Sequence, residues 1–573
     1  MSIIDPRRAL ERLTVDSFGG IRSHAGLEAG AAADLRNFRI LPDGSLEKRC
    51  GFATRFSFSV PVRGTWEGTI GGVSYFFAVA GDTVYCLEPD AEAPEAIYYL
   101  TTETGAVSFV YFVDRLYLLD GASMLFFRTG TGTFHISTGY TPLYGQNWHP
   151  TEMGSVNEPL NLVQNRIRIH YLNTTGSTVF QMPYTMKSVD RVKLNGSYIT
   201  NYTFTPGSST FRIPEGSAPG TVEVAATLDD IFNRRSTVLR CGNATVYKDP
   251  YHETMLLWGG TPGYTVYRTA HLTGQQLADC TSFYGSTDPV YIPENTSFAV
   301  GSAQHPVTAI CQNGEQALVF NDRSLWGIRH TDEESDGMQI VLIDGGIGCC
   351  PSRGAIPCGN DTVTVRENGI SLLHFSSGNP DVCTARTISG EIADRMTRSL
   401  LQNAILLWSR SANELWVHNP KDSAGLFWIY NLDRAFWTCF AITPAVGLLE
   451  SGGSVGLCSA SGPILYADEA LDTDNGVPIA AYYQSHFLSL SEPSLYKRAI
   501  RASLCADTGN ATLTLGLQTE RDEQDFTLTG SDTEAPEFLD RRLSLGRFRF
   551  LRYRISAFGS ARVRIYFLSL SAT

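Results

Sequence analysis

Short apolar runs separated by pairs of turn-forming residues extend along most of the chain, and this pattern limits the fold more than any other feature. In the first clear example, the runs 73–80 and 83–87 flank Gly81-Asp82. About thirty residues later, Asp114-Arg115 divides the apolar stretch 107–119 in the same way. Such runs around a two-residue turn predict antiparallel β-hairpins. We therefore expect a mainly β chain that consists of a meandering series of hairpins.

Similar pairs of runs return further along the chain, at loose spacing and without a strict repeat motif. They occupy residues 254–268, 317–329, 362–375, 404–418 and 425–440. We count about six such units, and short meandering strands at this spacing are typical of a propeller or a sandwich. The pattern predicts a β-propeller-like body in two parts, 61–155 and 240–471.

Other stretches predict smaller domains. Residues 156–239 contain short alternating strands with Pro and Gly breaks, which indicate a small β-sandwich inserted into the propeller at a surface loop. Residues 472–573 contain longer alternating strands, with arginines on one face of 547–555, and predict a C-terminal β-sandwich. Residues 1–60 are expected to form an N-terminal arm and a hairpin that begins the propeller.

One clear helix is predicted among these strands, and residues 7–13 are a second, short helix candidate. Over residues 389–401, the apolar side chains of Ile392, Met396 and Leu400 recur at four-residue intervals and share one helix face. We expect this helix to pack on the propeller rim or in a loop between blades.

Charge and cysteine usage limit the partners and the compartment. The formal net charge is −13 and no long basic run occurs, which argues against tight binding of nucleic acid. An acidic wall would still let a duplex pass without sticking, although the acidity can equally serve solubility alone. The 12 cysteines are scattered without zinc-type spacing, as in proteins folded in a cytosol with reduced thiols. No signal peptide or membrane span is predicted.

No motif of a known catalytic site is present. The chain lacks a Gly-x-Ser-x-Gly elbow, a His-Glu-x-x-His helix and a phosphate-binding loop, and its 11 histidines show no ligand spacing. We therefore expect no enzyme activity, no cofactor and no metal.

A glycosidase is harder to exclude, because its two carboxylates have no fixed sequence separation. Seven tryptophans could line a sugar groove: Trp148, Trp258, Trp326, Trp408, Trp416, Trp428 and Trp437. The last four fall within or beside apolar strands, which favours packing in the core.

Three segments near the N-terminus carry a resemblance to a known family. Phe18-Gly19-Gly20-Ile21 is followed by Asp34-Leu35-Arg36-Asn37-Phe38 and then by Asp43-Gly44-Ser45-Leu46-Glu47-Lys48-Arg49-Cys50-Gly51-Phe52. The series resembles the start of the tail-nozzle proteins, or packaged-DNA stabilisation proteins, of short-tailed (podovirus-type) bacteriophages. Cys50 departs from the family's usual Lys-Arg-Pro-Gly. The stretches 345–349, 368–370 and 428–437 resemble parts of the family's propeller.

The resemblance implies a structural virion protein of a phage tail, made in the host cytoplasm. Six copies would form a nozzle-like ring, a homo-oligomer (hexamer) that closes the distal tail channel, retains packaged DNA and lets it pass at ejection. The implied partners are tail adaptor or portal-proximal proteins, tail fibre or needle proteins, and passing double-stranded DNA that is not bound sequence-specifically.

The residues expected to serve assembly are Asp34, Asn37, Asp43, Gly44, Lys48 and Arg49. The residues alone are equally consistent with Lys48-Arg49 being only a charged strand edge that prevents non-native pairing with other strands. Two alternative functions stay open. One is a distal tail or baseplate component of a long-tailed phage, and the other is a propeller protein that binds or cleaves glycans.

Overall fold

A computed structural model describes residues 11–24, 29–88, 93–217, 219–229, 235–284, 288–331, 337–376, 378–490, 492–529 and 536–573. The first ten residues of the predicted N-terminal arm lie outside these ranges. The chain is mainly β and divides into two compact units. Unit 1 comprises Met1–Val62, Cys350–His374 and Thr384–Thr573, and unit 2 comprises Arg63–Cys349 and Phe375–Cys383.

Seven four-stranded antiparallel sheets of the propeller type lie within the described residues, divided between the two units. Six of them follow the chain as a meander, the strand arrangement of propeller blades. Four of these sheets are formed by strands between residues 62 and 344: β6 (Val62–Ile70), β7 (Val73–Ala80), β8 (Thr83–Leu87) and β9 (Glu95–Tyr99); β10 (Ser108–Phe112), β11 (Arg115–Leu119), β12 (Met124–Arg128) and β13 (Thr133–Ile136); β22 (Asn243–Lys248), β23 (Glu253–Trp258), β24 (Thr265–Arg268) and β25 (Phe298–Ala299); β26 (Val307–Asn313), β27 (Gln316–Asn321), β28 (Leu325–His330) and β29 (Met338–Asp344).

The other three sheets follow later in the chain. They comprise β30 (Ala355–Cys358), β31 (Asp361–Arg366), β32 (Gly369–Ser376) and β33 (Asn379–Thr387); β34 (Ile405–Ser409), β35 (Glu414–His418), β36 (Leu426–Asn431) and β37 (Phe436–Ala441); and β38 (Ala445–Ser451), β39 (Ser454–Ser459) and β40 (Ile464–Asp468) with β5 (Gly51–Phe56). Because β5 pairs with β40, the edge strand of this last sheet comes from the N-terminal end of the chain.

The sequence pattern indicates about six units, and the described residues contain seven such sheets. The sheet that the pattern missed is β38–β40 with β5. Gly and Ser interrupt the apolar residues of β38 and β39, and the fourth strand lies far away in the sequence, with Phe52 opposite Ala467.

The C-terminal sandwich in unit 1 has two antiparallel sheets. One contains β43 (Ala499–Asp507), β46 (Glu537–Arg542) and β48 (Arg564–Ala572), and the other contains β41 (Thr473–Asp474), β42 (Val477–Ser485), β44 (Thr512–Thr519), β45 (Glu523–Thr529) and β47 (Leu551–Gly559). In β47 the alternate residues Leu551, Tyr553 and Ile555 are buried, as the period of two in a half-buried strand requires. The arginines Arg552 and Arg554 therefore lie on the opposite face.

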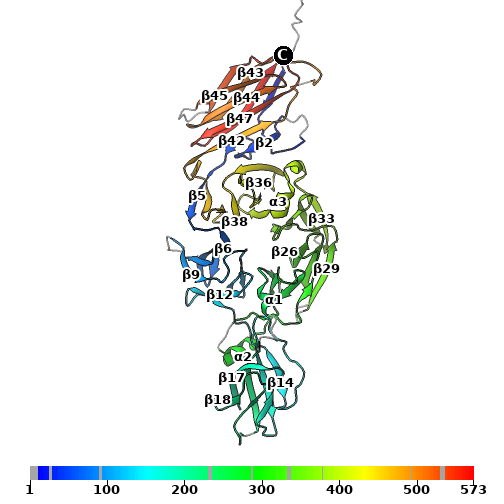
Figure 1. Cartoon of the computed structure of the whole chain (residues 1–573). Helices are drawn as coiled ribbons and strands as arrows, with labels where there is room; N and C mark the ends of the chain where they lie inside the picture. Colours follow the sequence, from blue (N-terminus) through cyan, green and yellow to red (C-terminus); the bar gives the residue numbers. More distant parts are fainter. Residues whose placement is uncertain are drawn as a thin grey trace, which may run out of the picture. The chain divides into compact units, whose positions relative to one another are not determined.

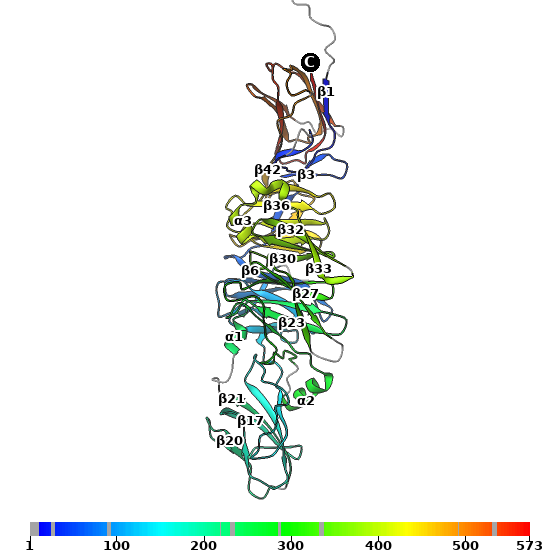
Figure 2. The same ribbon diagram turned by 90° about the vertical axis from the view of Figure 1, so that its right-hand side faces the viewer.

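Four N-terminal strands complete these same two sheets. They are β1 (Glu11–Val15), β2 (Ala32–Arg36), β3 (Phe38–Ile40) and β4 (Leu46–Lys48). The strand β2 pairs with β42, whereas β1 and β4 both pair with β48. Figure 1 shows β2 in blue beside the orange and red strands β42 and β47, and Figure 2 shows β1 and β3 at the same sandwich.

The prediction that the opening hairpin begins the propeller is therefore wrong. The hairpin β3–β4 belongs to the C-terminal sandwich, because Leu46 of β4 lies opposite Ile565 of β48. Only β5, directly after the hairpin, enters a propeller-type sheet.

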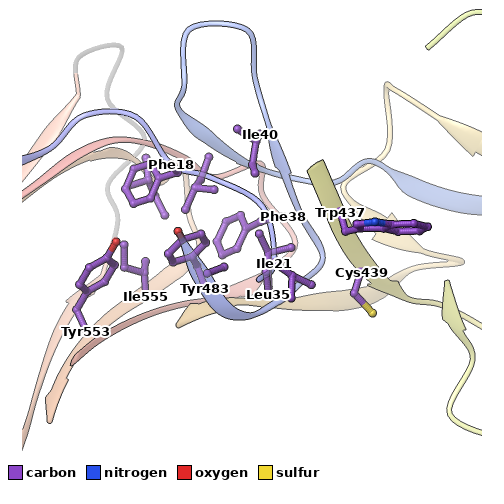
Figure 3. Packing of buried hydrophobic residues seen from close by; sticks show 14 of the residues in the cluster. Phe18, Ile21, Leu35, Phe38, Ile40, Trp437, Cys439, Tyr483, Tyr553 and Ile555 are labelled. Carbon is purple, nitrogen blue, oxygen red and sulfur yellow. The ribbon is translucent and has the colours of Figure 1, made fainter. Parts of the chain in front are cut away.

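The core of unit 1 forms around the N-terminal segment. Figure 3 shows Phe18, Ile21, Leu35 and Phe38 packed with Tyr483 of β42, and all five side chains are buried. The rings of Phe18 and Tyr483 meet edge to face at 5.3 Å between centroids. Full burial of one such aromatic or aliphatic side chain contributes about 1.5–3 kcal/mol, so the segment is held mainly by apolar packing.

The small sandwich in unit 2 lies between β13 and β22 in the sequence. Its larger sheet contains β14 (Leu143–Trp148), β15 (Arg166–Asn173), β17 (Met186–Leu194), β18 (Ser197–Ile199) and β21 (Gly220–Leu228), and its smaller sheet contains β16 (Val179–Gln181), β19 (Thr203–Phe204) and β20 (Thr210–Arg212). The helix α2 (Gly274–Tyr284) lies alongside this sandwich (Figure 2), where Arg191 of β17 donates a hydrogen bond to the carbonyl of Phe283.

The predicted helix over 389–401 is interrupted. A 3-10 helix spans Gly390–Arg395, and the short helix α3 spans Arg398–Asn403. Thr397 is extended (φ −63°, ψ 153°) and its hydroxyl accepts a hydrogen bond from the amide of Leu400, so it caps a new helix. The apolar spacing nevertheless buries Ile392, Met396 and Leu400 as expected. No helix among the described residues has the length and apolar character needed to cross a membrane.

Candidate assembly site

All six residues predicted to serve assembly lie in one stretch of unit 1. Asp34 is in β2, Asn37 lies between β2 and β3, and Asp43-Gly44 forms the turn between β3 and β4. Lys48 ends β4 and Arg49 follows it. The structure therefore brings the predicted residues together around one hairpin, but it places them in three different environments.

The turn of the hairpin is fixed by its own side chains. Oδ1 of Asp43 accepts hydrogen bonds from the amide and the hydroxyl of Ser45 at 3.0 and 2.6 Å. These bonds, together with the guanidinium of Arg564, lower the pKa of Asp43 to about 2. Gly44 has a φ of +85°, and a Cβ there would lie 2.9 Å from the Cα of Ser17. The tight turn therefore requires glycine.

Asn37 connects two strands of unit 1 to the hairpin. Its backbone has a positive φ of 58°, which asparagine tolerates better than most residues. The amide Nδ2 donates to the carbonyl of Ala480 at 2.7 Å, and Oδ1 accepts from the amide of Ala441 at 2.8 Å. Its own backbone amide donates to the carbonyl of Cys439 at 2.9 Å. One side chain thus links β42 of the sandwich to β37 of a propeller-type sheet.

Arg49 is buried, with a side chain only 1% exposed. Its two terminal nitrogens bind both carboxylate oxygens of Asp474, at 2.8 and 2.6 Å. The remaining bonds go to Oδ1 of Asn37 and to the carbonyls of Cys50 and Ala441, each at 2.9 Å. All five hydrogen bonds thus satisfy the planar guanidinium, which is the condition for burying it.

Lys48 and Asp34 are also bonded within the chain. Nζ of Lys48 donates to the carbonyl of Gly559 at 2.9 Å, and the residue is 0% exposed. Burial lowers the pKa of Lys48 to about 8, although the negative charge of Asp472 partly opposes this. Oδ2 of Asp34 accepts a hydrogen bond from the hydroxyl of Tyr482 at 2.7 Å.

The interpretation of Lys48-Arg49 as a charged strand edge is consequently wrong, since both side chains are buried. The geometry makes Asn37, Lys48, Arg49 and Asp474 an internal joint of unit 1, and we call these four residues the buried joint. An assembly role of the predicted residues stays a prediction. Among them, Asp43 is the one with a largely exposed side chain.

Sequence reasoning missed Asp474, the carboxylate that pairs with Arg49. It lies 425 positions away from Arg49, and no pattern in the sequence joins the two. The one local signal is that Asp474 directly precedes Asn475-Gly476, a strong turn pair. That signal indicates a turn but not a partner.

The other candidate residues are mostly in the core. Of the seven tryptophans considered for a sugar groove, Trp148, Trp258, Trp416, Trp428 and Trp437 are buried, whereas Trp326 and Trp408 are half-buried. The expectation of core packing for the last four tryptophans is confirmed for Trp416, Trp428 and Trp437, whereas Trp408 is half-buried. Ten of the 12 cysteines are buried, in agreement with the prediction of mostly buried thiols.

Comparisons with known proteins add little to this geometry. No protein-family model and no curated protein matches the chain. Among solved structures, the chain is similar to PorZ, a bacterial surface component of the type-IX secretion system of Porphyromonas gingivalis, with 11% identity and a TM-score of 0.33 over 78% of this chain. It is also similar to YCF48 in a complex with a D1 peptide, with 8% identity and a TM-score of 0.33 over 73% of this chain and 95% of that one. The match spans 44% of the PorZ chain. At these TM-scores we base no argument on either similarity.

Proposed function

We propose that the chain is a structural component of a phage tail that forms a nozzle-like ring at the distal end of the tail channel. In this function the ring retains packaged DNA and lets it pass at ejection. The observation that supports the proposal is that the segments with the family resemblance contain three of the four residues of the buried joint. Asn37, Lys48 and Arg49 belong both to the family-like segments and to this joint.

A rigid joint suits a part whose work is mechanical. Within unit 1, the segment 34–56 is bonded first to the sandwich and then to a propeller-type sheet, through β4 on β48 and β5 on β40. A closure that holds DNA must resist force without its domains separating. Buried, fully bonded polar groups between elements serve this purpose because they leave few alternative arrangements.

The charge of the chain supports passage rather than capture of DNA. A net charge of −13 repels phosphate groups, so a duplex would slide along the protein without being held. The partners in the proposal are five further copies of this chain, a tail adaptor or portal-proximal protein, and tail fibre or needle proteins.

Electron microscopy of the purified full-length chain tests the proposal. We expect rings of about six copies, seen as particles of about six times 62.8 kDa by mass photometry and as ring views in negative stain. Immunogold labelling of phage particles should place the chain at the distal end of a short tail. A chain that stays monomeric at every concentration and is absent from particles would overturn the proposal.

The same experiments separate the alternatives. Label at the distal end of a long tail would identify a baseplate component. Specific binding on a glycan array, or cleavage of a polysaccharide, by a monomeric chain would identify a glycan-directed propeller protein. Gel-shift titration with duplex DNA at about 0.15 M salt should show no stable complex, since an acidic surface offers few phosphate contacts.

A further inference from the structure

Two histidines and an aspartate meet in unit 2, far from the buried joint in the sequence. Asp249 and His252 lie in the turn between β22 and β23, and His330 ends β28 of the next propeller-type sheet along the chain. One oxygen of Asp249 and one ring nitrogen from each histidine all lie within 4.8 Å of one another. We propose that Asp249, His252 and His330 bind a divalent transition-metal ion of the Zn²⁺ class.

The donor atoms suit such an ion. Imidazole nitrogen and carboxylate oxygen are ligands of Zn²⁺ and of Co²⁺, at about 2.0–2.2 Å from the metal. Two ligands of a tetrahedral ion are then about 3.4 Å apart. The distance from Nε2 of His330 to Oδ2 of Asp249 is 3.7 Å, so this pair already has nearly that spacing. The remaining distances, up to 4.8 Å, require only side-chain rotation toward the ion.

The cluster is buried, and one of its nitrogens has no hydrogen-bond partner among the described residues. His252 is 8% exposed, and the side chains of Asp249 and His330 are 6% and 3% exposed. Nδ1 of His252 is enclosed and makes no hydrogen bond. Leaving a buried ring nitrogen without a partner is unfavourable, and a metal ion at this position would supply the missing partner.

The surroundings hold the ligands in place. The backbone amides of Tyr251 and His252 donate to Oδ1 of Asp249 at 2.8 and 2.7 Å, which leaves Oδ2 directed toward His330. The ring of Tyr247 stacks on that of His330, and its hydroxyl donates to the carbonyl of Glu315 at 2.8 Å. Supporting hydrogen bonds of this kind orient metal ligands in known sites.

The fourth position of a tetrahedral ion is open to water or to His271, an exposed residue whose ring centroid lies 5.0 Å from that of His252.

The prediction of no metal ligands came from sequence spacing alone. Asp249 and His252 are three positions apart, but His330 belongs to another sheet, so no local motif includes all three. A bound ion would fasten the β22–β23 turn to the end of β28. This inference does not depend on the proposed tail function.

Zinc binding by the untagged full-length chain tests the proposal. After treatment with EDTA and desalting, the protein is titrated with Zn²⁺ alone, and the bound zinc is measured by inductively coupled plasma mass spectrometry. We expect about one equivalent per chain, with affinity lowered at least tenfold in His252→Ala and in Asp249→Asn. The matched control is His149→Ala, an exposed histidine of the same unit, which should bind as the wild type does.

The absorption spectrum of the Co²⁺-loaded wild type provides a second test that requires no variant. Ligation by nitrogen and oxygen gives visible bands without the near-ultraviolet thiolate band that cysteine ligands produce. Failure of the wild type to bind either ion would overturn the proposal. A thiolate band, or unchanged zinc affinity in folded His252→Ala and Asp249→Asn, would assign the ion to other residues and would overturn it equally.

Discussion

Removing the cation of the buried joint should destabilise unit 1 strongly. In Arg49→Met, the five hydrogen bonds of the guanidinium are lost, and the carboxylate of Asp474 loses its partner. Breaking a buried ion pair from one side costs about 3–5 kcal/mol. Because the side chain of Asp474 is 27% exposed, water can still hydrate that charge. We therefore expect the lower end of this range, about 3 kcal/mol.

Removing the anion should cost more. In Asp474→Asn, the guanidinium of Arg49 stays 1% exposed and keeps only neutral acceptors. Because this unpaired charge is almost fully buried, we expect the free energy of unfolding to fall by about 5 kcal/mol. In the double variant the stranded cation is absent, so the loss should return to about 3 kcal/mol, which corresponds to a coupling energy of several kcal/mol between the two side chains.

Hydrogen exchange measures this effect where it occurs. A chain with two units need not unfold in one step, so the free energy of local opening is taken from peptides that cover residues 46–56 and 473–485. The control is Arg398→Met, an exposed arginine of the same unit, which should change opening by less than about 0.5 kcal/mol. The reasoning is refuted if Arg49→Met is as mild as the control, or if Asp474→Asn costs less than Arg49→Met.

Two further perturbations test the hairpin that leads into the joint. Gly44→Ala should destabilise unit 1 by at least about 1 kcal/mol more than the control Gly476→Ala. Both glycines have nearly the same φ (+85° and +84°), but only at Gly44 would the new methyl group meet Ser17. Equal losses of stability for the two variants in thermal unfolding would contradict this. For Lys48, the folded pKa of about 8 lies below the ordinary value of 10.5, so between these pH values the unfolded chain binds more protons and stability rises with pH. The unfolding free energies of the wild type and of Lys48→Met are measured in urea at pH 7.5 and at pH 10. The difference between them (wild type minus variant) should be larger at pH 10 by about 1–3 kcal/mol. An equal difference at both pH values would show that the amine is not desolvated.

The parts of the fold that local sequence dictates were predictable. The apolar runs around Gly81-Asp82 become β7 and β8, with the turn where it was expected. Asn195 and Gly196 both adopt positive φ between β17 and β18, as an Asn-Gly turn predicts. In each case the residues that determine the structure are neighbours, so a pattern over a few positions contains the information.

The parts that depend on distant partners were not predictable. Nothing near Leu46 indicates that β4 pairs with Ile565 of β48, and nothing near Phe52 indicates Ala467. The charged pair Lys48-Arg49 shows the same limit, since basic residues at a strand end are usually exposed. Their burial depends on Asp474 and on the carbonyl of Gly559, which only the folded chain brings within hydrogen-bond distance.

The position of Arg49 explains why so polar a group is buried there. Residues before it form β4 and pair with the sandwich, while residues after it form β5 and pair with a propeller-type sheet, so the chain changes its partner sheet at this residue. A change of partner sheet leaves backbone groups that need other hydrogen-bond partners. The carbonyl of Cys50 lies at this change, and the carbonyl of Ala441 lies at the end of β37. The guanidinium of Arg49 donates to both carbonyls and to Asp474 at once. A lysine offers three donors on a flexible stem and cannot reproduce this planar arrangement. Lys48 and Arg49, which end the opening hairpin, thus donate hydrogen bonds to backbone carbonyls where the sandwich and a propeller-type sheet of unit 1 meet.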